Sequence, residues 1–105
     1  MNEYKKWLAN YTASVKFPEV SGFEILEMLQ ARSYLAQIED RLSALKRLEL
    51  EAADTTFFTH AHEFYASLTD VTKLQELRAR MNVLPSHWWW YLDKLLQQKQ
   101  EAMAM

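Results

Sequence analysis

Hydrophobic residues recur along the chain at intervals of three and four positions, the spacing that places them on one face of a helix. The first such stripe predicts a helix from about residue 2 to residue 14. Its members are Tyr4, Trp7, Leu8, Tyr11 and Val15. Pro18 then ends this helix, because proline lacks a backbone donor and restricts the residue before it.

A second helix is predicted to start at Ser21 and to run to about Ala53. Ser21 and Glu24 have the spacing of a capping box, in which each side chain accepts a hydrogen bond from the backbone N–H of the other residue. An apolar stripe follows the later part of the segment: Tyr34, Leu35, Ile38, Leu42, Leu45 and Leu48. The apolar residues of 23–29 lie on a different face. The helix is therefore either buried on two sides or interrupted near residues 30–33.

Three more helices are predicted in the remaining chain. Residues 54–56 offer N-caps for a third helix, whose stripe is Phe57, Ala61, Phe64 and Leu68. From Leu74 onward the apolar residues fall on a different face of the helix from the stripe before them. We therefore expect a break at residues 69–70 and a fourth helix after it. Asn82 ends that helix, because asparagine tolerates the left-handed conformation. A fifth helix starts with Ser86 as its N-cap and runs to about Glu101.

These patterns predict an all-α fold, a small four- or five-helix bundle with a long central helix or a helical hairpin. The composition agrees, because the chain has 1 Gly and 2 Pro and the stretch from Phe23 to Leu84 has neither. Sheets need turns, and turns draw on these residues. A length of 105 residues fits a single helical domain, residues 1–105.

Composition and charge exclude several kinds of chemistry. The chain has 0 Cys, which removes disulfides, thiolate catalysis and cysteine-ligated zinc. One glycine is too few for a phosphate-binding loop. The net charge of −2 gives no positive field toward nucleic acid or anionic lipid. Residues 1–6 lack the apolar run of a signal peptide, and the uncharged stretch 83–92 is too short to span a membrane. We expect a cytoplasmic protein with no catalytic residues, no cofactor and no membrane association.

The consecutive aromatic residues Trp88, Trp89, Trp90 and Tyr91 are the most distinctive feature of the sequence. On a helix that starts at Ser86, Trp88 and Trp89 share the apolar face and Trp90 points the other way. Trp90 then either packs on the preceding loop or the first helix, or anchors an interface, where tryptophan and tyrosine are enriched. The candidate partner-binding residues are Trp90, Tyr91, Trp7 and Tyr11.

The sequence also has more apolar faces than one small core needs. Leaving several large apolar side chains exposed is unfavourable, since burying each contributes about 1.5–3 kcal/mol. We therefore expect self-association, as a homodimer with two-fold symmetry. The main functional hypothesis is a non-catalytic interaction protein, either an adaptor, an assembly chaperone or a regulatory subunit, that binds another protein through an aromatic-rich surface.

A second hypothesis comes from residues 77–92. Apolar residues occupy the register of a helix-turn-helix motif at Leu77, Met81, Val83, Trp88, Tyr91 and Leu92. The segment resembles that family of DNA-binding regulators. The resemblance implies duplex binding by residues 70–98, with Arg78, Arg80 and Lys94 on the phosphates. The residues that would face the bases are Ser86, Trp89, Trp90 and Asp93, which are poor base readers. Protein is therefore the expected partner ahead of nucleic acid.

A third hypothesis rests on two pairs of carboxylates. Glu24 and Glu27 share one helical face, and so do Glu51 and Asp54. This pattern resembles the all-α nucleoside triphosphate pyrophosphohydrolases. The resemblance implies a Mg²⁺ ion held by these four carboxylates. The main hypothesis includes no metal site, because His60 and His62 are two residues apart and point to nearly opposite sides of a helix.

Overall fold

The computed structural model describes the backbone of residues 3–104 and the side-chain surroundings of residues 4–98. Within these residues it is all-helical and has no strands, which confirms that the fold is all-α, although the described residues form six α-helices and not the four or five that were predicted. The elements in chain order are α1 (Glu3–Ser14), α2 (Gly22–Ile38), the 3₁₀ turn η1 (Glu39–Arg41), α3 (Ala44–Thr59), α4 (Ala61–Thr69), α5 (Leu74–Met81), the 3₁₀ turn η2 (Trp88–Trp90) and α6 (Leu92–Ala104).

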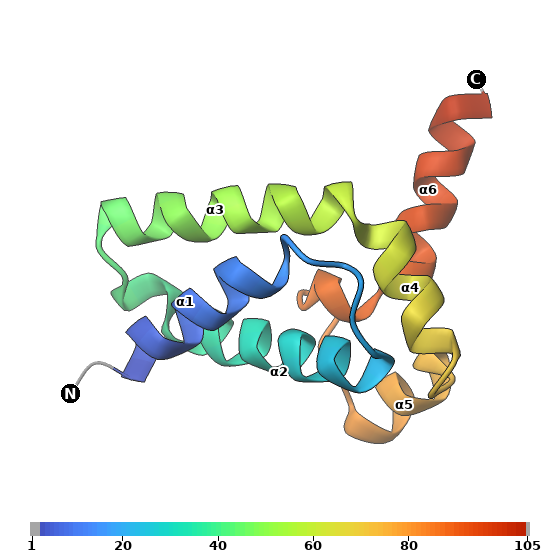
Figure 1. Ribbon diagram of the computed structural model, residues 1–105, viewed down its shortest axis with the longest axis horizontal. Helices are drawn as coiled ribbons and strands as arrows, with labels where there is room; N and C mark the ends of the chain where they lie inside the picture. The colour runs from blue at the N-terminus through green and yellow to red at the C-terminus, as the bar shows by residue number, and fades with distance from the viewer. Residues whose placement is uncertain (1–2, 105) are drawn as a thin grey trace.

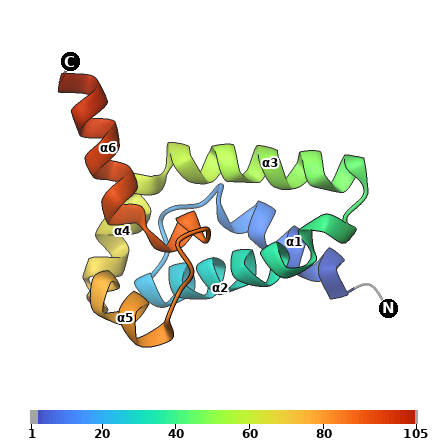
Figure 2. The ribbon, with the colours of Figure 1, turned by 180° about the vertical axis from the view of Figure 1, so that it is seen from behind.

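Helices α2 and α3 run in opposite directions, and α1 lies between them and contacts both (Figure 1). Helices α4 and α5 close one end of this group. Helix α6 packs on α4 and then projects past α3, as the view from behind also shows (Figures 1 and 2). Among the described residues, no helix has both the length and the apolar character needed to cross a bilayer.

The single long helix predicted from Ser21 to Ala53 is wrong, because the chain reverses at η1. Ile38 leaves the helical region with φ −116° and ψ 7°, and Leu42 is extended. Ser43 then caps α3, since its hydroxyl accepts from the backbone N–H of Lys46 at 3.2 Å. This cap replaces the one expected at residues 54–56, which lie inside α3.

The fifth predicted helix also starts later than expected. Residues 83–87 form a loop, residues 88–90 form the η2 turn, and α6 begins only at Leu92. Three local predictions are confirmed. The capping box of Ser21 and Glu24 is formed, the chain breaks between α4 and α5 after residue 69, and Asn82 adopts the left-handed conformation with φ 52°.

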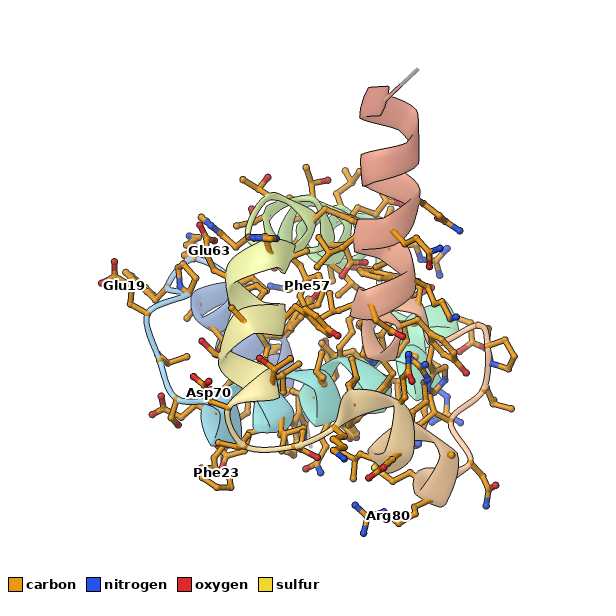
Figure 3. The ribbon with its side chains drawn as sticks, turned by 90° about the vertical axis from the view of Figure 1, so that its right-hand side faces the viewer. Glu19, Phe23, Phe57, Glu63, Asp70 and Arg80 are labelled. Carbon is orange, nitrogen blue, oxygen red and sulfur yellow. The ribbon has the colours of Figure 1, made fainter. Side chains whose placement is uncertain are left out.

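The core is formed by apolar side chains from all six helices and from η2. Its largest fully buried members are Tyr11, Phe57, Phe64, Trp89 and Trp90. Figure 3 shows Phe57 pointing inward, whereas Phe23, Asp70 and Arg80 lie at the periphery. The start of α2 approaches the end of α4 closely at Gly22. A Cβ atom there would lie 2.4 Å from the carbonyl oxygen of Ser67 and 2.6 Å from a methyl carbon of Val71.

We predict that Gly22→Ala destabilises the protein by about 1–3 kcal/mol, because the added methyl group forces α2 and α4 apart. The obstructing atom is a backbone oxygen, which a rotamer change does not move. Urea unfolding followed by circular dichroism measures the effect. A variant as stable as the wild type would show that this approach is looser than the structure indicates.

Candidate functional site

A buried ionic network centred on Arg32 connects three helices. The side chain of Arg32 is only 5 % exposed. Its Nε donates to Oδ1 of Asp54 at 2.9 Å and its Nη2 donates to Oδ2 at 3.0 Å, a bidentate pair that joins α2 to α3. Nη2 also donates to Oε1 of Glu39 at 3.1 Å, which holds η1 against α2.

Helix α1 joins this network through Tyr11. The Tyr11 hydroxyl donates to Oδ1 of Asp54 at 2.6 Å. Burial raises the pKa of Tyr11 far above its usual value, and the neighbouring Asp54 carboxylate raises it further. Tyr11 therefore remains a neutral donor and ties α1 to the same carboxylate that binds Arg32.

The guanidinium of Arg32 also lies against the tryptophan cluster. Its central carbon is 4.3 Å from the ring centroid of Trp89 and 5.8 Å from that of Trp88, which are cation–π distances. Nη1 of Arg32 is buried and has no hydrogen-bond partner among the described residues. The His87 ring stacks on the Trp89 ring with their centroids 4.7 Å apart. Burial lowers the pKa of His87, and the positive charge of Arg32 lowers it further.

Ser33 receives two indole N–H groups. Trp89 donates to the Ser33 hydroxyl oxygen at 2.9 Å and Trp90 donates at 2.8 Å. Trp90 is only 1 % exposed, so of the two alternatives for this residue the interface anchor is wrong and Trp90 packs within the chain. The prediction assumed α-helical phase, but η2 is a 3₁₀ turn with about three residues per turn. In that geometry both indoles reach α2.

The other predicted partner-binding residues fall in two places. Tyr91 is half-buried, and its hydroxyl donates to the carbonyl of Val83 at 3.0 Å. This hydrogen bond stabilises the loop before η2. Trp7 and Tyr11 both line a groove between α1 and α2, although Tyr11 itself is 0 % exposed. The structure therefore separates Trp90 and Tyr91 from Trp7 and Tyr11.

The three cations proposed for DNA binding differ in their surroundings. Arg78 is paired with Asp93, from Nη1 to Oδ1 at 2.7 Å, and donates to the carbonyl of Trp90 at 3.0 Å. Burial would raise the pKa of Asp93, but hydrogen bonds from Arg78 and Gln75 lower it below its usual value. Arg80 and Lys94 are exposed. The recognition helix expected from Ser86 is absent from the described residues, because η2 occupies that segment.

The four carboxylates proposed as a magnesium site are not brought together. Glu24 caps α2, Glu51 is exposed on α3, and Asp54 is bound to Arg32 and Tyr11. No group of three or more metal-ligating side chains occurs in the part of the chain that the structure describes. The predicted four-carboxylate cluster is therefore wrong. Asp54 is already bound by Arg32 and Tyr11.

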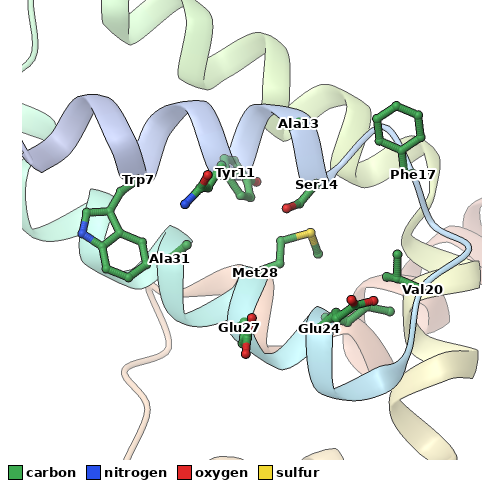
Figure 4. Close-up of a pocket in the computed structure, with 12 residues that line it drawn as sticks. Trp7, Tyr11, Ala13, Ser14, Phe17, Val20, Glu24, Glu27, Met28 and Ala31 are labelled. Carbon is green, nitrogen blue, oxygen red and sulfur yellow. The ribbon is translucent and has the colours of Figure 1, made fainter.

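The groove between α1 and α2 has a volume of about 410 Å³ (Figure 4). Trp7 stands at one end and Phe17 at the other. Val20, Ile25, Met28 and Ala31 supply apolar walls. Its charged lining residues are both acidic, namely Glu24 and Glu27.

A second hollow of about 380 Å³ lies between α2 and the segment 81–90. Trp90 forms part of its wall, and Met81 and Leu84 are exposed beside it. Its polar lining comprises Gln30, Ser33, Tyr34, Gln37, Asn82 and His87, and no Asp, Glu, Lys or Arg lines it. Nothing in the structure indicates what would bind there, whereas the α1–α2 groove combines apolar walls with charge of one sign.

Comparisons with protein-family models, with curated proteins and with solved structures found no match to the chain. A function is therefore inferred from the chemistry of the protein's own surfaces.

We predict that Ser33→Ala destabilises the protein by about 2–4 kcal/mol, because it leaves two buried indole N–H groups without an acceptor. The matched control is Ser86→Ala, which removes an exposed loop hydroxyl and should change stability by less than about 0.5 kcal/mol. Chemical unfolding monitored by tryptophan fluorescence compares the two variants. Equal stability of the two would contradict the shared-acceptor role of Ser33.

Proposed function

We propose that this protein is a non-catalytic interaction module that binds an apolar, positively charged segment of another protein in the groove between α1 and α2. The observation that carries the proposal is the groove itself, which has apolar walls and only acidic groups among its charged lining residues. Trp7 retains the partner-binding role expected from the sequence, whereas Tyr11 is 0 % exposed and its hydroxyl is bound to Asp54. Trp90 and Tyr91 do not retain it, because they serve the core and the adjoining loop. The cytoplasmic location stays a prediction from the sequence.

The exposure of Phe17 supports a macromolecular partner. Phe17 is 64 % exposed at the mouth of the groove, and its ring is available to a segment that continues past the cavity. Trp7 and Ser14 of α1 both line the groove and are about 10 Å apart along the helix axis. An amphipathic helix presents apolar side chains over such a length at positions i, i+3, i+4 and i+7.

The charge of the groove selects the kind of segment. Glu24 and Glu27 lie one helical turn apart on the α2 side. Lysine or arginine side chains that flank an apolar stripe would lie opposite these carboxylates. Charge complementarity of this type favours the basic partner and disfavours an acidic one by like-charge repulsion.

The proposal is tested with two designed amphipathic helical peptides, one built of leucine and lysine and the other of leucine and glutamate. We expect the lysine peptide to bind at least about tenfold more tightly in calorimetric titration. Phe17→Ala should weaken its binding about tenfold, and Glu27→Lys should abolish the preference between the peptides, because the added positive charge offsets that of Glu24.

Phe23→Ala is the matched control for Phe17→Ala. Phe23 is 65 % exposed but does not line the groove, so its removal should leave the affinity unchanged. Equal affinity for the two peptides, or equal effects of the two phenylalanine variants, would overturn the proposal.

A further inference from the structure

The segment 84–87 lies between α5 and η2 and has one half-buried side chain, that of His87. Residues 84–86 are exposed. Val83, just before the segment, is fixed by its carbonyl, which accepts from the Tyr91 hydroxyl at 3.0 Å. A segment with few buried contacts opens locally at little cost in free energy, so the contacts of His87 decide where this segment lies.

The ring of His87 and the guanidinium of Arg32 lie against the same indole. The His87 ring stacks on Trp89 with the centroids 4.7 Å apart and 22° between the planes. The central carbon of Arg32 is 4.3 Å from the Trp89 ring centroid. Hydrogen bonds to Asp54 and Glu39 hold Arg32 in place. Neutral His87 stacks favourably here, whereas a protonated ring adds a second cation beside a fixed one.

Among the described residues, no carboxylate is placed to balance a positive charge on His87. The hollow that His87 lines has no Asp or Glu in its wall, and Tyr34 is the titratable side chain that α2 contributes to it. Met81, at the end of α5, lines the same hollow, and the last turn of that helix carries Arg78 and Arg80. No described carboxylate forms an ion pair with His87. A proton on this ring therefore has basic groups around it and no anion beside it.

The two carboxylates bound to Arg32 do not supply that anion. Asp54 accepts from Nε and Nη2 of Arg32, and Glu39 accepts from Nη2. Nη1 is buried and has no hydrogen-bond partner in the described part of the chain. Burial lowers the pKa of His87 from its ordinary value of 6.5, and the positive charge of Arg32 lowers it further.

The packed and the released states of the segment 84–87 bind protons unequally. On a released segment His87 has an ordinary pKa, whereas on Trp89 its pKa is lower. The packed state therefore binds fewer protons. Its advantage is fully present above pH 6.5 and is lost as the pH falls below that value through the lower pKa of the packed ring.

We propose that His87 is a pH-sensitive latch, which holds the segment 84–87 on Trp89 while its ring is neutral and releases the segment when its ring is protonated. Release opens the hollow of about 380 Å³ between α2 and residues 81–90, since His87 forms part of its wall. The η2 turn stays in place, because the indole N–H groups of Trp89 and Trp90 remain bound to Ser33. The opening is therefore local.

Hydrogen exchange followed by mass spectrometry at about pH 7.5 and about pH 5 tests the latch. After correction for the intrinsic pH dependence of exchange, we expect the protection of residues 84–90 to fall at least about threefold at the lower pH. The reporting amides are those of His87 and Trp90, which donate to the carbonyls of Leu84 and His87. The protection of α2 should not change, because Arg32 anchors it at both pH values.

The variants separate the charge of His87 from its ring. His87→Phe keeps an aromatic ring on Trp89 without a titratable group, so its segment should be equally protected at both pH values. His87→Gln should also lose the pH response, at the lower protection of an unlatched segment. The matched control, His62→Gln, removes an exposed histidine from α4 and should respond like the wild type.

Equal protection of the wild-type segment at both pH values would overturn the proposal. A pH response that persists in His87→Phe would overturn it as well. The exchange measurement needs no peptide, so it is independent of binding in the α1–α2 groove.

Discussion

The ion pair between Arg32 and Asp54 is the interaction on which the arrangement of the other elements depends. It is bidentate and largely buried, with the side chains of Arg32 and Asp54 5 % and 17 % exposed, and it joins two helices that are separated in sequence by the η1 turn. The carboxylate also receives the Tyr11 hydroxyl, and the guanidinium lies over the Trp89 ring. Burying two charges costs several kcal/mol of desolvation, which only near-ideal geometry and further hydrogen bonds offset. Such a network selects one relative placement of its members, because a shifted register leaves a charge or an indole N–H unpaired.

This placement also determines which surfaces remain free for partners. Tyr11 ties α1 to Asp54 of α3, the carboxylate that binds Arg32 of α2, and Tyr11 also lines the groove between α1 and α2. Asp54 turns one face of α3 toward the network, so that the opposite face, with Leu45 and Leu48, is directed to solvent. The groove and the α3 face therefore lie on different sides of the same network.

The sequence predicted the features that depend on residues close to one another in the chain. The capping box, the left-handed Asn82 and the helical character all depend on residues within a few positions of one another. The break at η1 was missed because it contains neither Gly nor Pro, although Ser43 offered a cap signal. Asp54 and Trp90 were misplaced for a different reason. Their partners, Arg32 and Ser33, lie 22 and 57 residues away, and no periodicity encodes such a pairing. The one available signal was the polar pair Arg32-Ser33 inside an apolar helix. Of the candidate site, the sequence identified Trp7 and Tyr11 but not the groove that they share.

A double-mutant cycle on Arg32 and Asp54 tests the central role of this pair most directly. Arg32→Met, Asp54→Ala and the double variant are compared with the wild type by urea unfolding at pH 7. Each single variant should lose about 3–5 kcal/mol, because it leaves one buried charged group without its partner. The double variant should lose less than the sum of the two losses by at least about 1 kcal/mol. Losses that add within about 0.5 kcal/mol would show that the two side chains act independently, and would contradict the role of the pair as the organising interaction of the fold.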